Sequence, residues 1–344
     1  MLPSAAALPD PLAAALTDAA PGPALPPGPR MNLWRAAGAE PVPVRGALAA
    51  LVDVLGRPGP PHVLDDGTVT GVPRRAVPSA GGAHPVHVHV AVGPAGLPDC
   101  GLGPGRYVVD HATATLLRRP GPAPSTGSQV VLTVQPGRSF GRYRRRAWPL
   151  WIADAAYALE AVRFLLDAPG PARVGPAADL RALLHVPAAA EVEAWRRRGL
   201  APEIVLAAVP LPEAPRVDPV RAAALAARRS PRLAEFAARR AAGHPPDPRA
   251  VAVARASGQA WVAGAAAVHV WTTRPQQDPV ALAADLWRIH RAAARRVYAG
   301  ALAGAVRCRP VSGMPAGPLG WPVHALACLP DADAPRPTPG GDPR

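Results

Sequence analysis

Short runs of apolar and β-branched residues, separated by turns rich in Gly and Pro, predict several β-strands in the first 210 residues. The clearest run is VHVHVAV at residues 86–92, where valines and histidines alternate and therefore lie on opposite faces of a strand. The runs GRYVVD, QVVLTV and IVLAAV, at residues 105–110, 129–134 and 204–209, predict three more strands. The first half of the chain is therefore expected to contain a sheet.

Apolar residues at helical spacing predict three helices. The first covers residues 45–56 and ends at a glycine. The second covers residues 148–170, where a Pro-Gly pair stops a long and mostly buried apolar pattern. The third begins after Asp278, which is followed by a proline at the first helical position, and continues to about Gly304.

The two halves of the chain end with the same order of features. In each half a long predicted helix leads to a short segment (PARVG or RCRPVSG), then a gap, then an apolar strand followed by prolines. This order indicates a duplicated domain whose second copy is shorter. We therefore divide the chain into a disordered leader (1–31), a first domain (32–212), a degenerate second half (213–330) and a disordered tail (331–344).

The composition narrows the classes of partner. The chain has 344 residues, of which 49% are hydrophobic, so it can form a sizeable core. Its formal net charge is +14, and arginine supplies all of the positive charge because the sequence contains no lysine. A strong positive charge can indicate nucleic acid, a membrane surface or an anionic ligand. Here the arginines are spread along apparent helices without interleaved aromatic residues, which favours a compositional preference for Arg over a nucleic-acid surface.

No segment indicates export or a membrane. No apolar run approaches the length of a membrane span. Residues 1–31 lack the positively charged start of a signal peptide, and Met31 is an alternative first residue. The three cysteines form no CxxC motif and no ligand cluster, which fits a reducing compartment and argues against a disulfide framework. We expect a cytoplasmic protein without nucleic-acid or membrane partners.

The segment RRAVPSAGGAHPVHVHVAV, residues 74–92, carries the most chemistry. Its Pro-Ser-Ala-Gly-Gly turn at 78–82 permits positive φ angles and lets a flat or anionic ligand approach the backbone closely. Arg74 and Arg75 offer charge-assisted donors for a phosphate or an electron-rich ring. The alternative is an ordinary turn before a strand, with two solvated arginines.

This segment, with GLGPGRYVVD at 101–110, resembles the flavin-dependent nitroreductase superfamily, most closely the azoline dehydrogenases that oxidise thiazoline and oxazoline rings in ribosomally made peptides. The matching residues are Arg74, Arg75, Pro78, Ser79, Gly81, Gly82, Ala83, Pro85, Gly105, Tyr107 and Asp110. The resemblance covers about residues 45–210. It implies an α+β, nitroreductase-like fold that binds FMN non-covalently at a dimer-type interface. The residues expected to bind FMN are Arg74, Arg75, Pro78, Ser79, Ala80, Gly81, Gly82 and His84.

A second block, residues 141–159, resembles the family segment that carries a Lys-Tyr pair linked to azoline oxidation. Tyr143 matches, as do Arg146, Ala147 and Asp154, but Arg142 replaces the lysine and Tyr157 replaces a histidine. Aromatising an azoline requires removal of a ring proton and delivery of a hydride to the flavin. Arg142 stays protonated and can only stabilise negative charge. Tyr143 is therefore the expected general base, with its pKa lowered by Arg142 and Arg144; the alternative is that it merely packs at a loop.

Three further features have competing interpretations. His87 and His89 share one face of a predicted strand, but no third ligand is visible, which favours a polar sheet face over a metal site. RRSPR at 228–232 resembles the phosphate clamp that opens many nitroreductase domains, or matches it by chance. RCRPVSG at 307–313 is predicted to be a further basic turn, and the alternative is a solvated loop.

The resemblance implies an FMN-dependent dehydrogenase that converts azolines to thiazoles or oxazoles in a precursor peptide, with a cyclodehydratase as a further partner. Reduced flavin is reoxidised by O2 in that family. One alternative is a catalytically impaired relative that binds the peptide or acts as a scaffold of a biosynthetic complex. Another is a generic NAD(P)H-dependent nitroreductase. The assembly is expected to be a homodimer or an intrachain pseudo-dimer.

Overall fold

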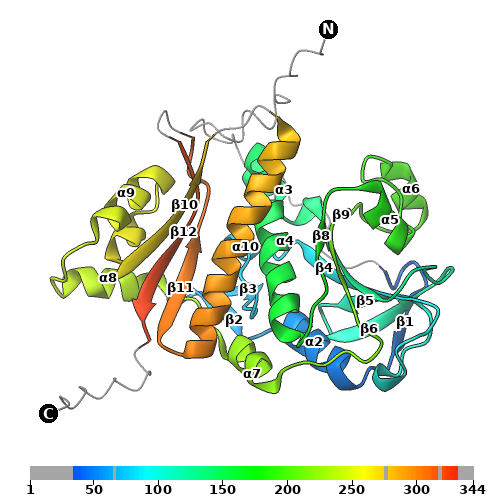
Figure 1. Ribbon diagram of the computed structural model, residues 1–344. Coiled ribbons are helices and arrows are strands. Elements are labelled where there is room, and N and C mark those ends of the chain that lie inside the picture. The colour runs from blue at the N-terminus through cyan, green and yellow to red at the C-terminus, as the bar shows by residue number, and fades with distance from the viewer. Residues whose placement is uncertain (1–33, 65–66, 275–277, 317–319, 332–344) are drawn as a thin grey trace, which may run out of the picture.

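The computed structural model describes residues 34–64, 67–274, 278–316 and 320–331. The predicted leader, and the predicted tail after its first residue, lie outside these ranges. Each half of the chain contributes an antiparallel sheet, and the longest helices of the two halves lie side by side between the sheets (Figure 1).

Within the described residues the larger sheet has seven strands in the order β1-β6-β5-β4-β7-β9-β8, and all neighbours are antiparallel. The strands are β1 (Glu40–Val42), β4 (Val86–Val92), β5 (Gly105–Asp110), β6 (Thr115–Arg119), β7 (Gln129–Val134), β8 (Arg173–Val174) and β9 (Ile204–Pro210). The four predicted strands are confirmed as β4, β5, β7 and β9. The alternation of β4 places Val88 and Val90 on one face of the sheet and its histidines on the other.

Helices cover both faces of this sheet. The helices α2 (Gly46–Gly56) and α4 (Ala147–Leu165) pack on the valine face of β4. The short helices α5 (Ala178–Leu184) and α6 (Val192–Arg197) belong to smaller clusters on the opposite face. The first predicted helix is confirmed. The second ends at Leu165 and not at residue 170, because Leu166 is extended and bridges to Val217.

The second half forms a smaller unit that packs on the first. Its helices are α7 (Pro219–Ala227), α8 (Leu233–Ala241), α9 (Pro248–Ser257) and α10 (Pro279–Ala303), and its sheet has the order β10 (Ala267–Thr273), β12 (Trp321–Pro330), β11 (Val306–Val311). The Asp278 carboxylate caps α10 by accepting from the amides of Val280 and Ala281, which confirms the predicted start of the third helix. No helix within the described ranges is long and apolar enough to cross a membrane.

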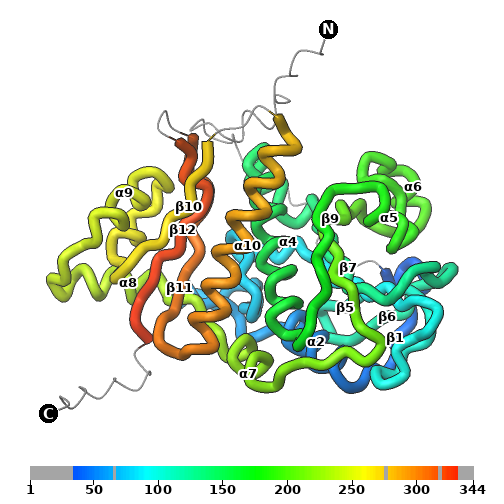
Figure 2. Tube along the Cα trace, in the orientation of Figure 1, coloured from blue at the N-terminus to red at the C-terminus, as the bar shows by residue number. Residues whose placement is uncertain are grey.

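The two halves share one arrangement of strands around a long helix. In the first half β7 leads through α4 to β8 and β9, and the spatial order is β7-β9-β8. In the second half β10 leads through α10 to β11 and β12, and the order is β10-β12-β11. The helices α4 and α10 pack against each other (Figure 2).

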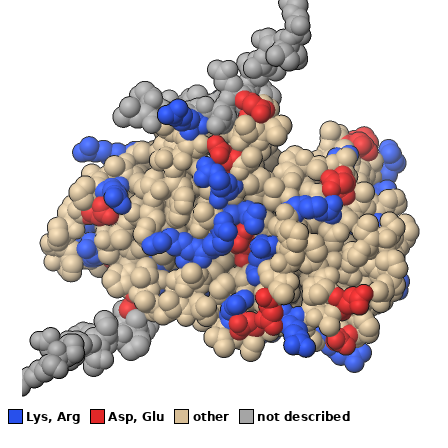
Figure 3. All heavy atoms as spheres, in the orientation of Figure 1, with Lys and Arg blue, Asp and Glu red and all other residues tan. Residues whose placement is uncertain are grey.

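Basic side chains gather over α10 on the face drawn in Figure 3. Two arginines of α10, Arg291 and Arg295, lie 2.5 and 3.9 Å from the buried carboxylate of Glu160 on α4. Ion pairs with Glu160 therefore link α10 to α4.

The segment at 307–313 corrects one expectation, because residues 306–311 form the strand β11 and not a turn. Cys308 and Val311 are buried, whereas Arg307 pairs with Glu235 of α8 and Arg309 donates to the carbonyl oxygen of Pro231. Arg307 and Arg309 thus each donate a hydrogen bond within the second half.

Two small elements frame the segment of greatest chemical interest. The hairpin β2 (Pro61–Val63) and β3 (Val69–Pro73) leads directly into Arg74. The short helix α3 (Phe140–Tyr143) connects β7 to α4. Both lie near the start of β4, where the candidate site forms.

Candidate functional site

The loop between β3 and β4 has a backbone that requires glycine. Gly81 and Gly82 have φ angles of 56° and 68°, and His84 has a φ of 45°. Glycine adopts these left-handed conformations without a steric penalty, whereas His84 is strained. The positive φ angles expected for the Gly-Gly pair are confirmed.

Asp154 of α4 anchors this loop. Its carboxylate accepts hydrogen bonds from the Ser79 hydroxyl at 3.1 Å and the Ala80 amide at 2.9 Å. The Ser79 oxygen in turn accepts from the His84 amide at 2.9 Å. Asp154 is only 4% exposed, and burial raises the pKa of its carboxyl to about 7 although both hydrogen bonds lower it.

The predicted catalytic pair lies against the same loop. The Arg142 guanidinium donates to the Gly81 carbonyl oxygen at 3.3 Å. A Cβ atom added to Gly81 would overlap the Tyr143 hydroxyl, so the tyrosine contacts the glycine backbone directly. The fold therefore brings together two motifs that are about sixty residues apart in the sequence.

The expected electrostatics of Tyr143 are wrong. Burial raises the pKa of its phenol, since the phenolate loses more hydration than the neutral form. The Arg142 guanidinium opposes this shift, but the Asp154 carboxylate adds to it. At neutral pH Tyr143 is therefore a phenol and a hydrogen-bond donor.

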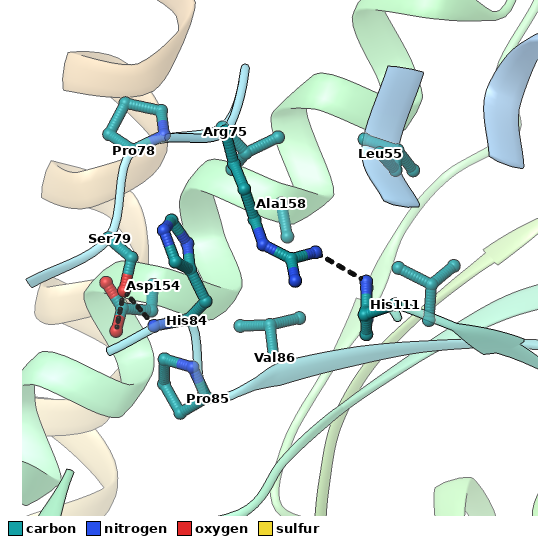
Figure 4. Close-up of a pocket in the computed structure, with 12 residues that line it drawn as sticks. Leu55, Arg75, Pro78, Ser79, His84, Pro85, Val86, His111, Asp154 and Ala158 are labelled. Atoms are coloured by element: carbon teal, nitrogen blue, oxygen red, sulfur yellow. Dashed lines mark hydrogen bonds between the residues drawn. The ribbon is translucent and has the colours of Figure 1, made fainter. Parts of the chain in front are cut away.

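A cavity of about 40 Å3 lies beside the loop (Figure 4). Its lining includes Arg75, Pro78, Ser79, His84, His111 and Asp154. The Arg75 Nη1 atom donates to His111 Nδ1 at 2.8 Å, which leaves the proton of neutral His111 on Nε2. Neither that Nε2 nor the Nε of Arg75 has a hydrogen-bond partner among the described residues, although both atoms are buried.

The cavity is positively charged. Burial, with the charge of Arg138, lowers the pKa of Arg75 only to about 10, so the guanidinium stays protonated. Burial and these two arginines lower the pKa of His84 to about 3, so that histidine is neutral. No carboxylate within the described ranges lies at ion-pair distance from Arg75. A half-buried cation without a carboxylate partner suits an anionic or electron-rich ligand.

The predicted loop residues divide into separate groups. Arg75, Pro78, Ser79 and His84 line the cavity. Ala80 binds Asp154, and Gly81 faces Tyr143. The backbone of Arg74 pairs with residues 59–60, and its side chain does not line the cavity. The sequence does not show which of the two adjacent arginines points into the cavity.

The second half reaches the same loop through residues 228–232. The buried Arg228 guanidinium donates from Nε to the Ala76 carbonyl oxygen at 2.6 Å and from Nη1 to the Ser230 hydroxyl at 3.2 Å. Arg309 of β11 donates to the carbonyl oxygen of Pro231 at 3.0 Å. The two basic motifs of the second half therefore meet each other beside the loop of the first half.

His87 and His89 do not form the polar surface that their alternation indicated. Both are buried, and both hydrogen-bond to one carboxylate, Glu203, at 2.8 and 3.0 Å. Burial alone would raise the pKa of Glu203, but the two histidines hold it well below its ordinary value. Glu203 directly precedes the predicted strand at 204–209, but its partners lie more than a hundred residues away. Among the described residues no cluster of His, Cys, Asp or Glu is arranged to hold a metal ion.

The hydrogen-bond donors around the loop suit FMN, but the cavity beside the loop is too small for it. The glycine turn and the two unpartnered donors match a flat ring with carbonyl oxygens, and the arginines near Ser230 match a phosphate. A cavity of about 40 Å3 holds a few water molecules and is far too small for a flavin. A flavin could lie against the loop only if neighbouring side chains, Tyr143 first among them, moved away from Gly81.

Comparisons with known proteins identify the fold. No protein-family model and no curated protein matches the sequence. A "putative nitroreductase" from Anabaena variabilis superposes with a TM-score of 0.59 at 14% identity, covering 84% of this chain and 93% of that one. A second solved structure of the same description, from Ralstonia eutropha, aligns over 57% of this chain and 94% of its own at 16% identity. Its TM-score of 0.27 is too low to indicate a shared fold. The chain therefore has a nitroreductase-like α+β fold.

Proposed function

We propose that this protein is an FMN-dependent oxidoreductase that oxidises azoline rings of a ribosomally made peptide to azoles. The observation that carries the proposal is the contact of Arg142 and Tyr143 with Gly81, inside a nitroreductase-like fold. These are the two motifs that resemble azoline dehydrogenases, and nothing in their sequence spacing requires them to meet.

The chain offers a place for each end of the cofactor. The backbone of residues 79–82 would lie against the flavin ring, and Arg75 would donate to its carbonyl oxygens. Arg228, Ser230 and Arg309 would hold the phosphate. When bound, FMN supplies the acceptor for a hydride. The protein supplies orientation and a site shielded from water.

The acid–base roles follow from the pKa directions. Tyr143 can take a proton only as a phenolate, and its raised pKa makes that form rare at neutral pH. We therefore assign its hydroxyl to hydrogen bonding of the substrate. Asp154 lines the cavity and has a pKa of about 7, which suits a group that accepts a proton near neutral pH.

The second half completes the site in this proposal. Its matching strand order supports the idea that it is a shorter copy of the first half. The first half then contributes the loop at 74–82 and the second half contributes the phosphate-binding arginines, so one chain forms one composite site. The peptide substrate, a cyclodehydratase partner and a cytoplasmic location belong to the same proposal.

Flavin content and product mass test the proposal in sequence. The purified protein should be yellow and should release FMN on denaturation. An azoline peptide should then lose about 2 Da per ring, the mass of two hydrogens transferred as hydride and proton. A protein that binds FMN but oxidises NAD(P)H with nitroaromatics, and leaves azolines unchanged, would be a generic reductase.

A second candidate, a catalytically impaired peptide-binding subunit, is favoured by two observations. Arg142 replaces the lysine of the resembling family, and the free volume beside the loop is only about 40 Å3. This candidate predicts a colourless protein that does not bind FMN on titration but still binds the azoline peptide.

A further inference from the structure

Two cysteines of the second half lie directly opposite each other on neighbouring strands. Cys308 of β11 faces Cys328 of β12, and their Sγ atoms are 2.9 Å apart. The side chains are buried on the face of the sheet that α10 covers, and Cys308 is 7% exposed. They are twenty positions apart in the sequence, so a search for CxxC spacing cannot find the pair.

The position of the pair in the ladder suits a covalent link. Antiparallel pairs alternate between hydrogen-bonded and non-hydrogen-bonded types, and the second type has Cα atoms about 4.5 Å apart. The Asp331 amide donates to the Ala305 carbonyl oxygen, so Cys308, three residues along β11, belongs to the second type. Pro310 lies two residues further along β11 and therefore belongs to the same type of pair. Its lack of an N–H is consistent with a non-hydrogen-bonded position. A Cα separation of about 4.5 Å falls within the range that disulfides span.

The surroundings distinguish the two thiols. The hydrogen bond from Cys328 lowers the pKa of the Cys308 thiol, burial raises it, and the guanidinium groups of Arg296 and Arg228 lower it further, with a net lowering. The pKa of Cys328 is raised by the same hydrogen bond and by burial. Cys308 is therefore the thiol of the pair that ionises more readily.

We propose that Cys308 and Cys328 are a modification site, a thiol pair that a hydroperoxide converts reversibly into an intramolecular disulfide. The Cys308 thiolate attacks one peroxide oxygen, the O–O bond breaks, and the leaving hydroxide takes a proton to become water. The Cys328 sulfur then attacks the Cys308 sulfenic acid, the S–S bond forms, and a second water leaves with the Cys328 proton. Two thiols lose two electrons in total, and one peroxide gains them.

Cys100 provides an internal control. It is fully buried in the first half, and burial raises the pKa of its thiol. It follows β4 in the larger sheet, whereas Cys308 and Cys328 both belong to the second sheet. An oxidant that acts through proximity and thiolate character should therefore spare it.

The test is a thiol count on the full-length protein. Reduced protein is treated with a small excess of hydrogen peroxide, quenched, denatured and titrated with a thiol reagent. We expect the number of free thiols to fall from three to one, the intact mass to fall by about 2 Da, and a linked peptide to contain Cys308 and Cys328. Dithiothreitol should restore all three thiols.

Two variants identify the attacking sulfur. Cys328→Ser should leave Cys308 to accumulate as a sulfenic or sulfinic acid, with a mass gain of about 16 or 32 Da. Cys308→Ser should show neither a gain nor a loss under the same treatment. The proposal is overturned if wild-type protein keeps three thiols while added glutathione is fully oxidised. It is also overturned if the link involves Cys100, or if it joins two chains in proportion to protein concentration.

Discussion

Replacing Asp154 by asparagine tests the electrostatics of the loop anchor. Asparagine has the same shape, and its amide can still accept from the Ala80 amide and donate to the Ser79 oxygen. The variant should therefore keep the loop conformation. What it removes is the ionisable carboxyl, which is 4% exposed and makes no ion pair among the described residues.

The magnitude follows from the difference between the folded and unfolded pKa. A folded pKa that is raised gives stability that is fully present below the unfolded value and is lost as the pH rises through the folded value. For Asp154 these values are about 7 and the ordinary 3.8, so the loss falls between about pH 4 and pH 8. Between pH 5 and pH 8 the wild type should lose about 3 kcal/mol more unfolding free energy than Asp154→Asn.

Urea unfolding at pH 5 and pH 8 measures this difference, because the other titrating groups are shared and cancel between the two proteins. Ser79→Ala supplies a further check, since the Ser79 hydrogen bond lowers the pKa of Asp154 and its loss should move the transition to higher pH. A difference below about 1 kcal/mol between the two pH values would mean that Asp154 titrates near its unfolded value. The assignment of a proton-accepting role at neutral pH would then fail with it.

Four further outcomes are expected. Tyr143→Phe should retain FMN and lower azoline turnover about tenfold to a hundredfold, as for a lost hydrogen bond; a loss near ten-thousandfold would restore Tyr143 as the base. Gly81→Ala should lower the unfolding free energy by about 2 kcal/mol more than Gly243→Ala, since both have positive φ but only Gly81 faces the Tyr143 hydroxyl. Glu203→Gln should lower the unfolding free energy by about 3 kcal/mol at neutral pH, as measured by urea unfolding. This loss should shrink as the pH falls below 4.5, because the lowered folded pKa of Glu203 gives stability that is lost as the carboxylate becomes protonated. Residues 32–214 expressed alone should aggregate or dimerise in size-exclusion chromatography, since α10 no longer covers α4; a soluble monomer would contradict the pseudo-dimer.

The regular elements of the fold could be predicted because their signals are local. The alternation in β4, the apolar spacing of α4 and the aspartate cap of α10 each depend on residues within a few positions of one another. The glycine turn at 81–82 was predictable for the same reason. The predicted end of α4 was wrong, because the bridge from Leu166 to Val217 is a tertiary contact that local signals do not show.

The electrostatics could not be predicted, because they depend on burial and on distant partners. The arginines beside Tyr143 indicated a lowered phenol pKa, but burial at the loop has the larger effect. The alternating histidines indicated a polar sheet face, but both are buried and hydrogen-bond to Glu203, which directly precedes β9. The pairing of Cys308 with Cys328 likewise requires the register of two strands.

One contact links the packing of the halves to the candidate site. Arg228 is buried, and no carboxylate in the described ranges pairs with it; its Nε donates to the Ala76 carbonyl oxygen, two residues before Pro78. A buried guanidinium deprived of that oxygen would be left with unsatisfied donors, at a cost of several kcal/mol. Any ligand that displaces the loop from Tyr143 must therefore either preserve this hydrogen bond or replace it with an acceptor of its own. An anionic group placed beside Arg228 would supply such an acceptor.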